Sequence, residues 1–114
     1  MSNSPLMEKS YRFSLSIIGL TRTLQLQKEF VLSKQALRSG TSIGANIEEA
    51  SQGQSRPDFI SKLSIALKEA YETRYWLRLL RDTNIVTAIT IEPLLENLQE
   101  IIRMLVASIK TAKK

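Results

Sequence analysis

Between residues 59 and 80, apolar and small residues recur at alternating intervals of four and three. The positions are Phe59, Leu63, Ala66, Ala70, Thr73, Leu77 and Leu80. This spacing puts all seven on one side of a helix about three heptads long, the pattern of a helix that packs against other helices. Ser55 and Pro57 suit the N-cap and first turn of such a helix. The segment therefore predicts a helix over residues 56–82 whose apolar seam the rest of the chain must cover.

Two other segments repeat the helical spacing. Phe13, Ile17, Leu20 and Leu24 follow one another by four, three and four, and so indicate a helix over residues 6–26. Leu95, Leu98, Ile102, Leu105 and Ile109 indicate another helix, over residues 91–112.

The start of the last helix is ambiguous on local propensity. The β-branched residues between Ile85 and Ile91 favour a strand, but a single strand in a helical chain has no partner. We predict instead that Thr90 is the N-cap, that Pro93 lies in the first turn and that Ile89 packs against Leu94. A start at Thr87 would place the Pro93 ring against the carbonyl of Ile89.

Residues 28–52 form the fourth expected helix, although two glycines lower its helix propensity. Ala36, Gly40 and Gly44 lie four residues apart, so one face of this helix has almost no side chains. We expect another helix to approach closely along that face. Short connections favour antiparallel neighbours, so residues 1–114 are predicted to form one all-α domain, an up-down-up-down four-helix bundle.

The composition argues against most enzyme classes. The chain has no Cys, which removes thiolate nucleophiles, and no His, which removes the commonest general base and metal ligand. No segment approaches the length of apolar sequence that spans a bilayer. We therefore expect a non-enzymatic cytoplasmic protein with no cofactor, no metal site, no small-molecule substrate and no membrane contact.

A polar stripe runs beside the apolar side of residues 28–52. It consists of Gln35, Arg38, Ser42, Asn46 and Glu49. Three interpretations are open: a hydrogen-bonded seam that fixes helix register, a subunit interface, or a ligand or catalytic pocket. The stripe contains no pair of a nucleophile and a base, which disfavours the pocket.

Four carboxylates on two of the expected helices could suggest a metal site. They are Glu48, Glu49, Glu69 and Glu72. Di-metal bundles combine such carboxylates with His, which is absent from this chain. We expect these groups to form ion pairs with Arg38, Arg74 or Lys68 instead.

Basic residues accompany aromatic ones late in the 56–82 helix. Arg74, Arg78 and Arg81 recur by four and three, with Tyr71, Tyr75 and Trp76 between them. Such a surface can bind phosphates and stack bases. The alternative is that these cations complement the helix dipole, and that Lys110, Lys113 and Lys114 are a solvated end of the chain. The net charge of +5 is spread along the chain and permits nucleic-acid binding without requiring it.

Residues 35–50 also carry a recognisable motif, Gln-x-x-Arg followed by Ser-Ile-x-x-Asn-Ile-x-Glu. The matching positions are Gln35, Arg38, Ser42, Ile43, Asn46, Ile47 and Glu49, and Glu72 in the next helix also fits. With these residues the chain resembles a bacterial four-helix-bundle family first noticed in intervening sequences of 23S ribosomal RNA genes. Glu48 and Ala50 depart from it, since Ala and Gly are commoner there.

The resemblance implies a left-handed bundle that assembles as a ring-like homopentamer. The family is similar in fold to the accessory protein of diversity-generating retroelements, which binds nucleic acid and a reverse transcriptase through a basic surface. The motif residues are carried over as structural positions and not as catalytic ones.

We expect self-association on physical grounds also, because Ile65, Trp76 and Leu79 flank the seam and should stay exposed in a single bundle. The favoured hypothesis is an oligomeric protein that binds structured RNA or DNA through basic faces. The alternative hypothesis is a protein–protein interaction scaffold with no nucleic-acid role.

Overall fold

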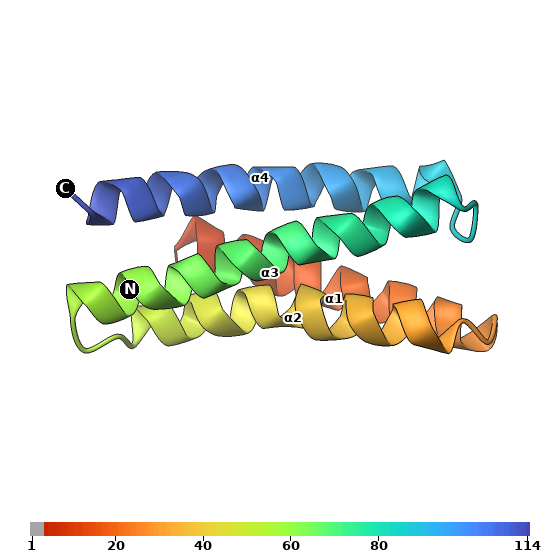
Figure 1. The fold of residues 1–114 in the computed structure, drawn as a ribbon, viewed down its shortest axis with the longest axis horizontal. Helices are drawn as coiled ribbons and strands as arrows, with labels where there is room; N and C mark the ends of the chain where they lie inside the picture. The colour runs from red at the N-terminus through yellow and green to blue at the C-terminus, as the bar shows by residue number, and fades with distance from the viewer. Residues whose placement is uncertain (1–3) are drawn as a thin grey trace.

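The computed structural model describes residues 4–114, which form four helices connected by short turns (Figure 1). These are α1 (Pro5–Leu26), α2 (Phe30–Ser51), α3 (Arg56–Asp82) and α4 (Ala88–Ala112). Consecutive helices run in opposite directions along a bundle of 45 × 21 × 19 Å. Residues 4–114 contain no strand, and the all-α fold class predicted from the apolar spacing is confirmed.

Local capping signals set the start of two helices. Ser4 Oγ accepts a hydrogen bond from the Met7 N–H (3.1 Å), and Ser55 Oγ accepts one from the Asp58 N–H (3.2 Å). A proline follows each serine in the first turn, where its missing N–H would have no helical partner in any case. The bounds of α3 are those predicted.

The turns α1–α2 and α3–α4 lie at the same end of the bundle and share one construction (Figure 1). Each contains a residue in the left-handed region, Lys28 (φ 65°) and Asn84 (φ 62°). The next N–H then returns to the preceding helix, from Glu29 to the Leu24 carbonyl (2.8 Å) and from Ile85 to the Leu80 carbonyl (3.1 Å). The predicted start of the second helix at residue 28 is therefore wrong: Lys28 belongs to the turn, and α2 begins at Phe30.

The predicted start of the last helix is also wrong. Thr87, not Thr90, occupies the N-cap position, and Pro93 is the sixth residue of α4. The earlier start adds two backbone hydrogen bonds, from the Thr90 and Ile91 N–H groups to the Thr87 carbonyl (3.1 and 3.0 Å), and Pro93 removes only its own. Ile89 is 88% exposed, so the expected packing of Ile89 against Leu94 does not stabilise the N-terminal turn of α4.

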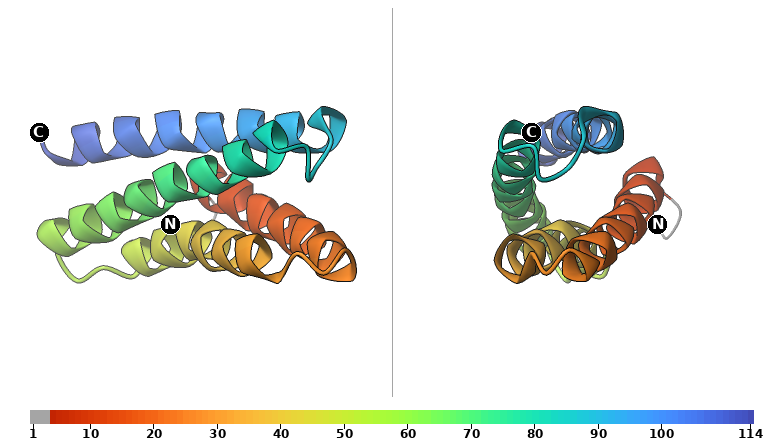
Figure 2. Two further views of the ribbon diagram at one scale, coloured as in Figure 1. Left: turned by 45° about the vertical axis from the view of Figure 1, so that its right-hand side comes forward. Right: turned by 90° about the vertical axis from the view of Figure 1, so that its right-hand side faces the viewer.

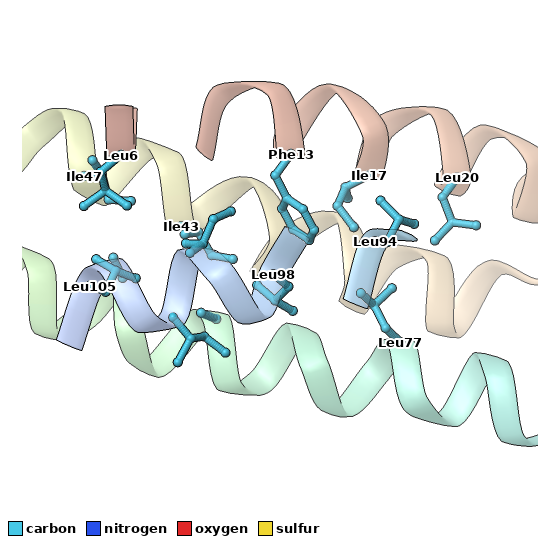
Figure 3. Close-up of a cluster of buried hydrophobic side chains, with 14 of the residues drawn as sticks. Leu6, Phe13, Ile17, Leu20, Ile43, Ile47, Leu77, Leu94, Leu98 and Leu105 are labelled. Atoms are coloured by element: carbon cyan, nitrogen blue, oxygen red, sulfur yellow. The ribbon is translucent and has the colours of Figure 1, made fainter. Parts of the chain in front are cut away.

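The core lies along the axis of the bundle and receives side chains from all four helices (Figure 3). Six of the seven seam positions of α3 are buried, and Phe59 packs at the edge. The glycine face of α2 lies against α1, as the spacing predicts. A Cβ atom built on Gly40 would lie 2.9 Å from Cγ1 of Ile17, and one on Gly44 would lie 3.4 Å from the Ser10 carbonyl oxygen.

Helices α1 and α4 are the least closely packed of the neighbouring pairs (Figure 2). A groove of about 560 Å³ lies between them, with Gly19 and Thr23 on one side and Thr90 and Leu94 on the other. Farther along, Lys9 and Glu100 join the two helices by an ion pair (2.7 Å), and this cation lowers the pKa of the Glu100 carboxyl. Within residues 4–114 no helix has the continuous apolar stretch that a bilayer crossing requires.

Candidate nucleic-acid interface

The polar stripe of α2 lies along the seam between α2 and α3. Arg38 donates to Gln35 Oε1 (3.3 Å), to Glu69 Oε1 (3.2 Å) and to Glu72. Glu72 also accepts a hydrogen bond from Nε1 of Trp76 (3.1 Å). The arginine therefore joins two turns of α3 to α2, which supports the interpretation of the stripe as a seam that fixes helix register.

The remaining stripe residues continue the same seam toward the other end of the bundle. Asn46 Nδ2 donates to the carbonyl and the hydroxyl of Ser42 (2.9 and 3.1 Å). Glu49 forms an ion pair with Lys62 (3.0 Å), and this hydrogen bond raises the pKa of the lysine. All six polar motif positions, including Glu72, are thus used in contacts within or between α2 and α3.

One buried polar pair under this seam was not predicted from the sequence. Thr73 Oγ1 lies 2.9 Å from Ser39 Oγ and 2.8 Å from the Glu69 carbonyl oxygen, and both side chains are fully buried. The signal was available, because Thr73 occupies a seam position where a hydroxyl needs a partner. Ser39 could have been found from its spacing, because it lies three residues after Ala36 and four before Ile43, in the apolar row of α2.

The buried side-chain polar atoms of residues 4–114 are hydrogen-bonded, and the acidic side chains in this range do not gather in groups of three. Glu69 and Glu72 form ion pairs with Arg38, one of the expected partners, whereas Glu49 pairs with Lys62, which was not predicted.

The three arginines of α3 do not have equivalent surroundings. Arg74 lies over the Tyr71 ring (5.0 Å to its centroid) and donates to Gln99 Oε1 of α4 (3.0 Å). Arg81 pairs with Asp82 (2.8 Å) and with Glu92 of α4 (3.3 Å), and the hydrogen bond to Asp82 raises its pKa most. Arg78 is exposed and forms no ion pair within residues 4–114. Arg74 also lacks an ion pair there, but its guanidinium is held by Gln99 and Tyr71, so Arg78 is the arginine of the three that no side chain in this range binds.

The lysines at the end of α4 lie far from these arginines. Eighteen residues separate Glu92, which contacts Arg81, from Lys110, and this corresponds to about 27 Å along a helix. Lys113 caps α4, and Lys114 follows it. Figure 1 shows the C-terminus and the α3–α4 turn at opposite ends of the bundle. The predicted basic residues therefore form two separate groups, one on α3 and one at the C-terminal end.

The chain is similar to a known protein family and to solved structures. The family model described as 23S rRNA-intervening sequence protein matches residues 2–107. A crystal structure from Bacteroides thetaiotaomicron, of a protein with unknown function from the S23 ribosomal protein family, superposes with a TM-score of 0.90 at 54% identity. The match covers 92% of this chain and 98% of that one. Among curated proteins, none matches.

Proposed function

Because the chain belongs to the 23S rRNA-intervening sequence protein family, we propose that it is a non-enzymatic, self-associating bundle that binds structured RNA or DNA through basic faces. The observation that carries this proposal is the environment of Arg78. Arg78 is exposed one helical turn from the exposed Tyr75 and two turns from the exposed Tyr71, and it forms no ion pair within residues 4–114. A cation in this setting can neutralise a phosphate without first losing a carboxylate partner.

The lysines at the C-terminal end support the proposal as a second, separate contact. Lys110, Lys113 and Lys114 are exposed at the end of the bundle away from Arg78. A nucleic acid that reached from Arg78 to Lys110 would have to span about 22 Å, roughly half of the 45 Å length of the bundle. The affinity for longer ligands should therefore exceed that for short ones, because only the longer ones engage both groups.

Filter binding with end-labelled hairpin RNA tests the proposal. At low salt we expect Arg78→Gln to weaken binding by about tenfold, because one phosphate contact is lost. Arg81→Gln is the matched control: it removes the same charge from the same helix, but that charge already pairs with Asp82 and Glu92. It should therefore weaken binding less. No detectable binding of RNA or DNA to the wild-type protein at low salt would overturn the proposal.

Self-association is the second part of the proposal, and exposed apolar side chains support it. Ile65 is 38% exposed, and Trp76 and Leu79 are half-buried, so these three expected residues lie partly at the surface. Two residues of α1, Tyr11 and Leu15, are more than half exposed. Light scattering at micromolar protein concentration should give a molar mass several times that of one chain. The family resemblance implies a pentamer, with a mass five times that of one chain. A monomer would contradict this part.

A protein–protein scaffold is the second candidate function, favoured by a group of apolar residues at one end of the bundle. The four most exposed large hydrophobic residues, Leu26, Phe30, Val31 and Ile89, all lie near the α1–α2 and α3–α4 turns. Pull-down from cell extract with and without nuclease separates the two functions. A partner protein retained after nuclease treatment favours the scaffold, whereas loss of all partners favours nucleic-acid binding.

A further inference from the structure

The outward face of α3 carries two tyrosines between two cations. Lys68, Tyr71, Tyr75 and Arg78 follow one another at intervals of three, four and three, which places them on one face of the helix. All four are exposed, the tyrosines by 44% and 53%. The ten residue steps from Lys68 to Arg78 span about 15 Å of helix. We call these four residues the Lys68–Arg78 face.

No side chain of residues 4–114 forms a hydrogen bond or an ion pair with the cations or the hydroxyls of this face. Neither Lys68 nor Arg78 forms an ion pair within residues 4–114, in contrast to Arg38 and Arg81, which both pair with carboxylates. The face therefore has a local positive charge at each end, with apolar ring surface between them.

Neighbouring side chains hold the two rings. The guanidinium of Arg74 lies 5.0 Å from the centre of the Tyr71 ring and is itself bonded to Gln99 of α4. Tyr75 meets Trp76 edge to face, with centroids 5.3 Å apart and planes at 68°. Trp76 is fixed in turn by its hydrogen bond to Glu72. Rings held in this way lose little conformational entropy when a flat ligand stacks on them.

We propose that the Lys68–Arg78 face binds unpaired nucleotides, with bases stacked on Tyr75 and Tyr71 and phosphates beside Lys68 and Arg78. This inference rests on the proposed nucleic-acid function and narrows its ligand to single strands, including the loops of structured RNA. The span of about 15 Å corresponds to about four nucleotides at the 3.4 Å spacing of stacked bases. A fully paired duplex hides its base faces, and so offers the tyrosines nothing on which to stack.

Two variants of Tyr75 separate stacking from simple charge attraction. Tyr75→Leu removes the ring at an exposed helix position, where leucine has good helix propensity, so the bundle should still fold. Tyr75→Phe keeps the ring and removes only the hydroxyl. We expect Tyr75→Leu to weaken single-strand binding by about tenfold and Tyr75→Phe to leave it nearly unchanged, because base stacking needs only the ring face.

The experiment measures fluorescence anisotropy with a short unstructured oligoribonucleotide and with a duplex of the same length. We expect the wild type to bind the single strand more tightly than the duplex. Tyr75→Leu should reduce this difference in affinity without changing the affinity for the duplex. Trp76 emission should also change when the single strand binds, since Tyr75 lies against the indole. Equal affinity for both ligands, unchanged in Tyr75→Leu, would overturn the inference and leave the proposed function intact. Binding of neither ligand would overturn both.

Discussion

Gly40→Leu should lower the free energy of unfolding by about 1–3 kcal/mol, the cost of overpacking a core. Even a Cβ at this position would lie 2.9 Å and 3.0 Å from Cγ1 and Cγ2 of Ile17. Ile17 is fully buried, and a β-branched side chain in a helix strongly prefers one χ1 rotamer, so moving it out of this space is costly. The gain of helix propensity from replacing a glycine, about 0.8–1 kcal/mol, offsets only part of this cost. Urea denaturation followed by circular dichroism measures the change.

Gly19→Leu is the matched control for this prediction. The substitution is the same and the position is also inside a helix, but a Cβ atom on Gly19 would meet no atom within 4 Å. We expect this variant to be more stable than the wild type by about 0.5–1 kcal/mol, from helix propensity alone. Similar shifts in both variants would mean that α1 and α2 do not approach closely at Gly40.

Pro93→Ala should raise the free energy of unfolding by about 1–2 kcal/mol. Proline costs about 3 kcal/mol inside a helix, and its removal restores an N–H that can bond to the Ile89 carbonyl. The gain is reduced because proline also restricts the unfolded chain. Since Pro93 is exposed, the substitution removes no core packing. Thermal or urea denaturation of the two proteins gives the difference directly.

Pro57→Ala provides the control for this second prediction. Pro57 is the second residue of α3, where an N–H would have no helical acceptor. Its replacement should lower the free energy of unfolding by about 0.4–1 kcal/mol, because the unfolded chain gains conformational freedom. If Pro93→Ala behaved like Pro57→Ala, α4 would begin close to Pro93, as the capping signals alone predict, and the start at Ala88 would be contradicted.

The ends of a helix could be predicted from the sequence where nearby residues determine them. Both ends of α3 follow from nearby residues: Ser55 and Pro57 at its start, and the seam that stops at Leu80. The predicted start of α4 is too late because the prediction placed Pro93 in the first turn of the helix. In the structure, the backbone hydrogen bonds that an extra turn makes to Thr87 favour the earlier start. The left-handed Lys28 gave no signal, since lysine has no preference for that conformation and the geometry of the α1–α2 turn imposes it.

The candidate site was predicted in its residues but not in its arrangement. Spacing alone placed Arg74, Arg78 and Arg81 on one face, whereas the availability of each charge depends on the opposite residue of α4. Gln99 and Glu92 engage two of the arginines, and this register between helices is a tertiary property. The separation of Lys110 from the arginines could have been derived, because antiparallel neighbours place the end of α4 beside the start of α3.

The salt dependence of RNA affinity tests the central claim, nucleic-acid binding through the exposed cations of α3, most directly. A hairpin RNA with an unpaired loop would be titrated with the wild type and with Arg78→Gln over a series of salt concentrations. We predict a linear fall of log K with log salt for the wild type, and a slope shallower by about one for Arg78→Gln, since one phosphate contact is lost. Identical slopes for the two proteins, or no binding at the lowest salt, would contradict the account.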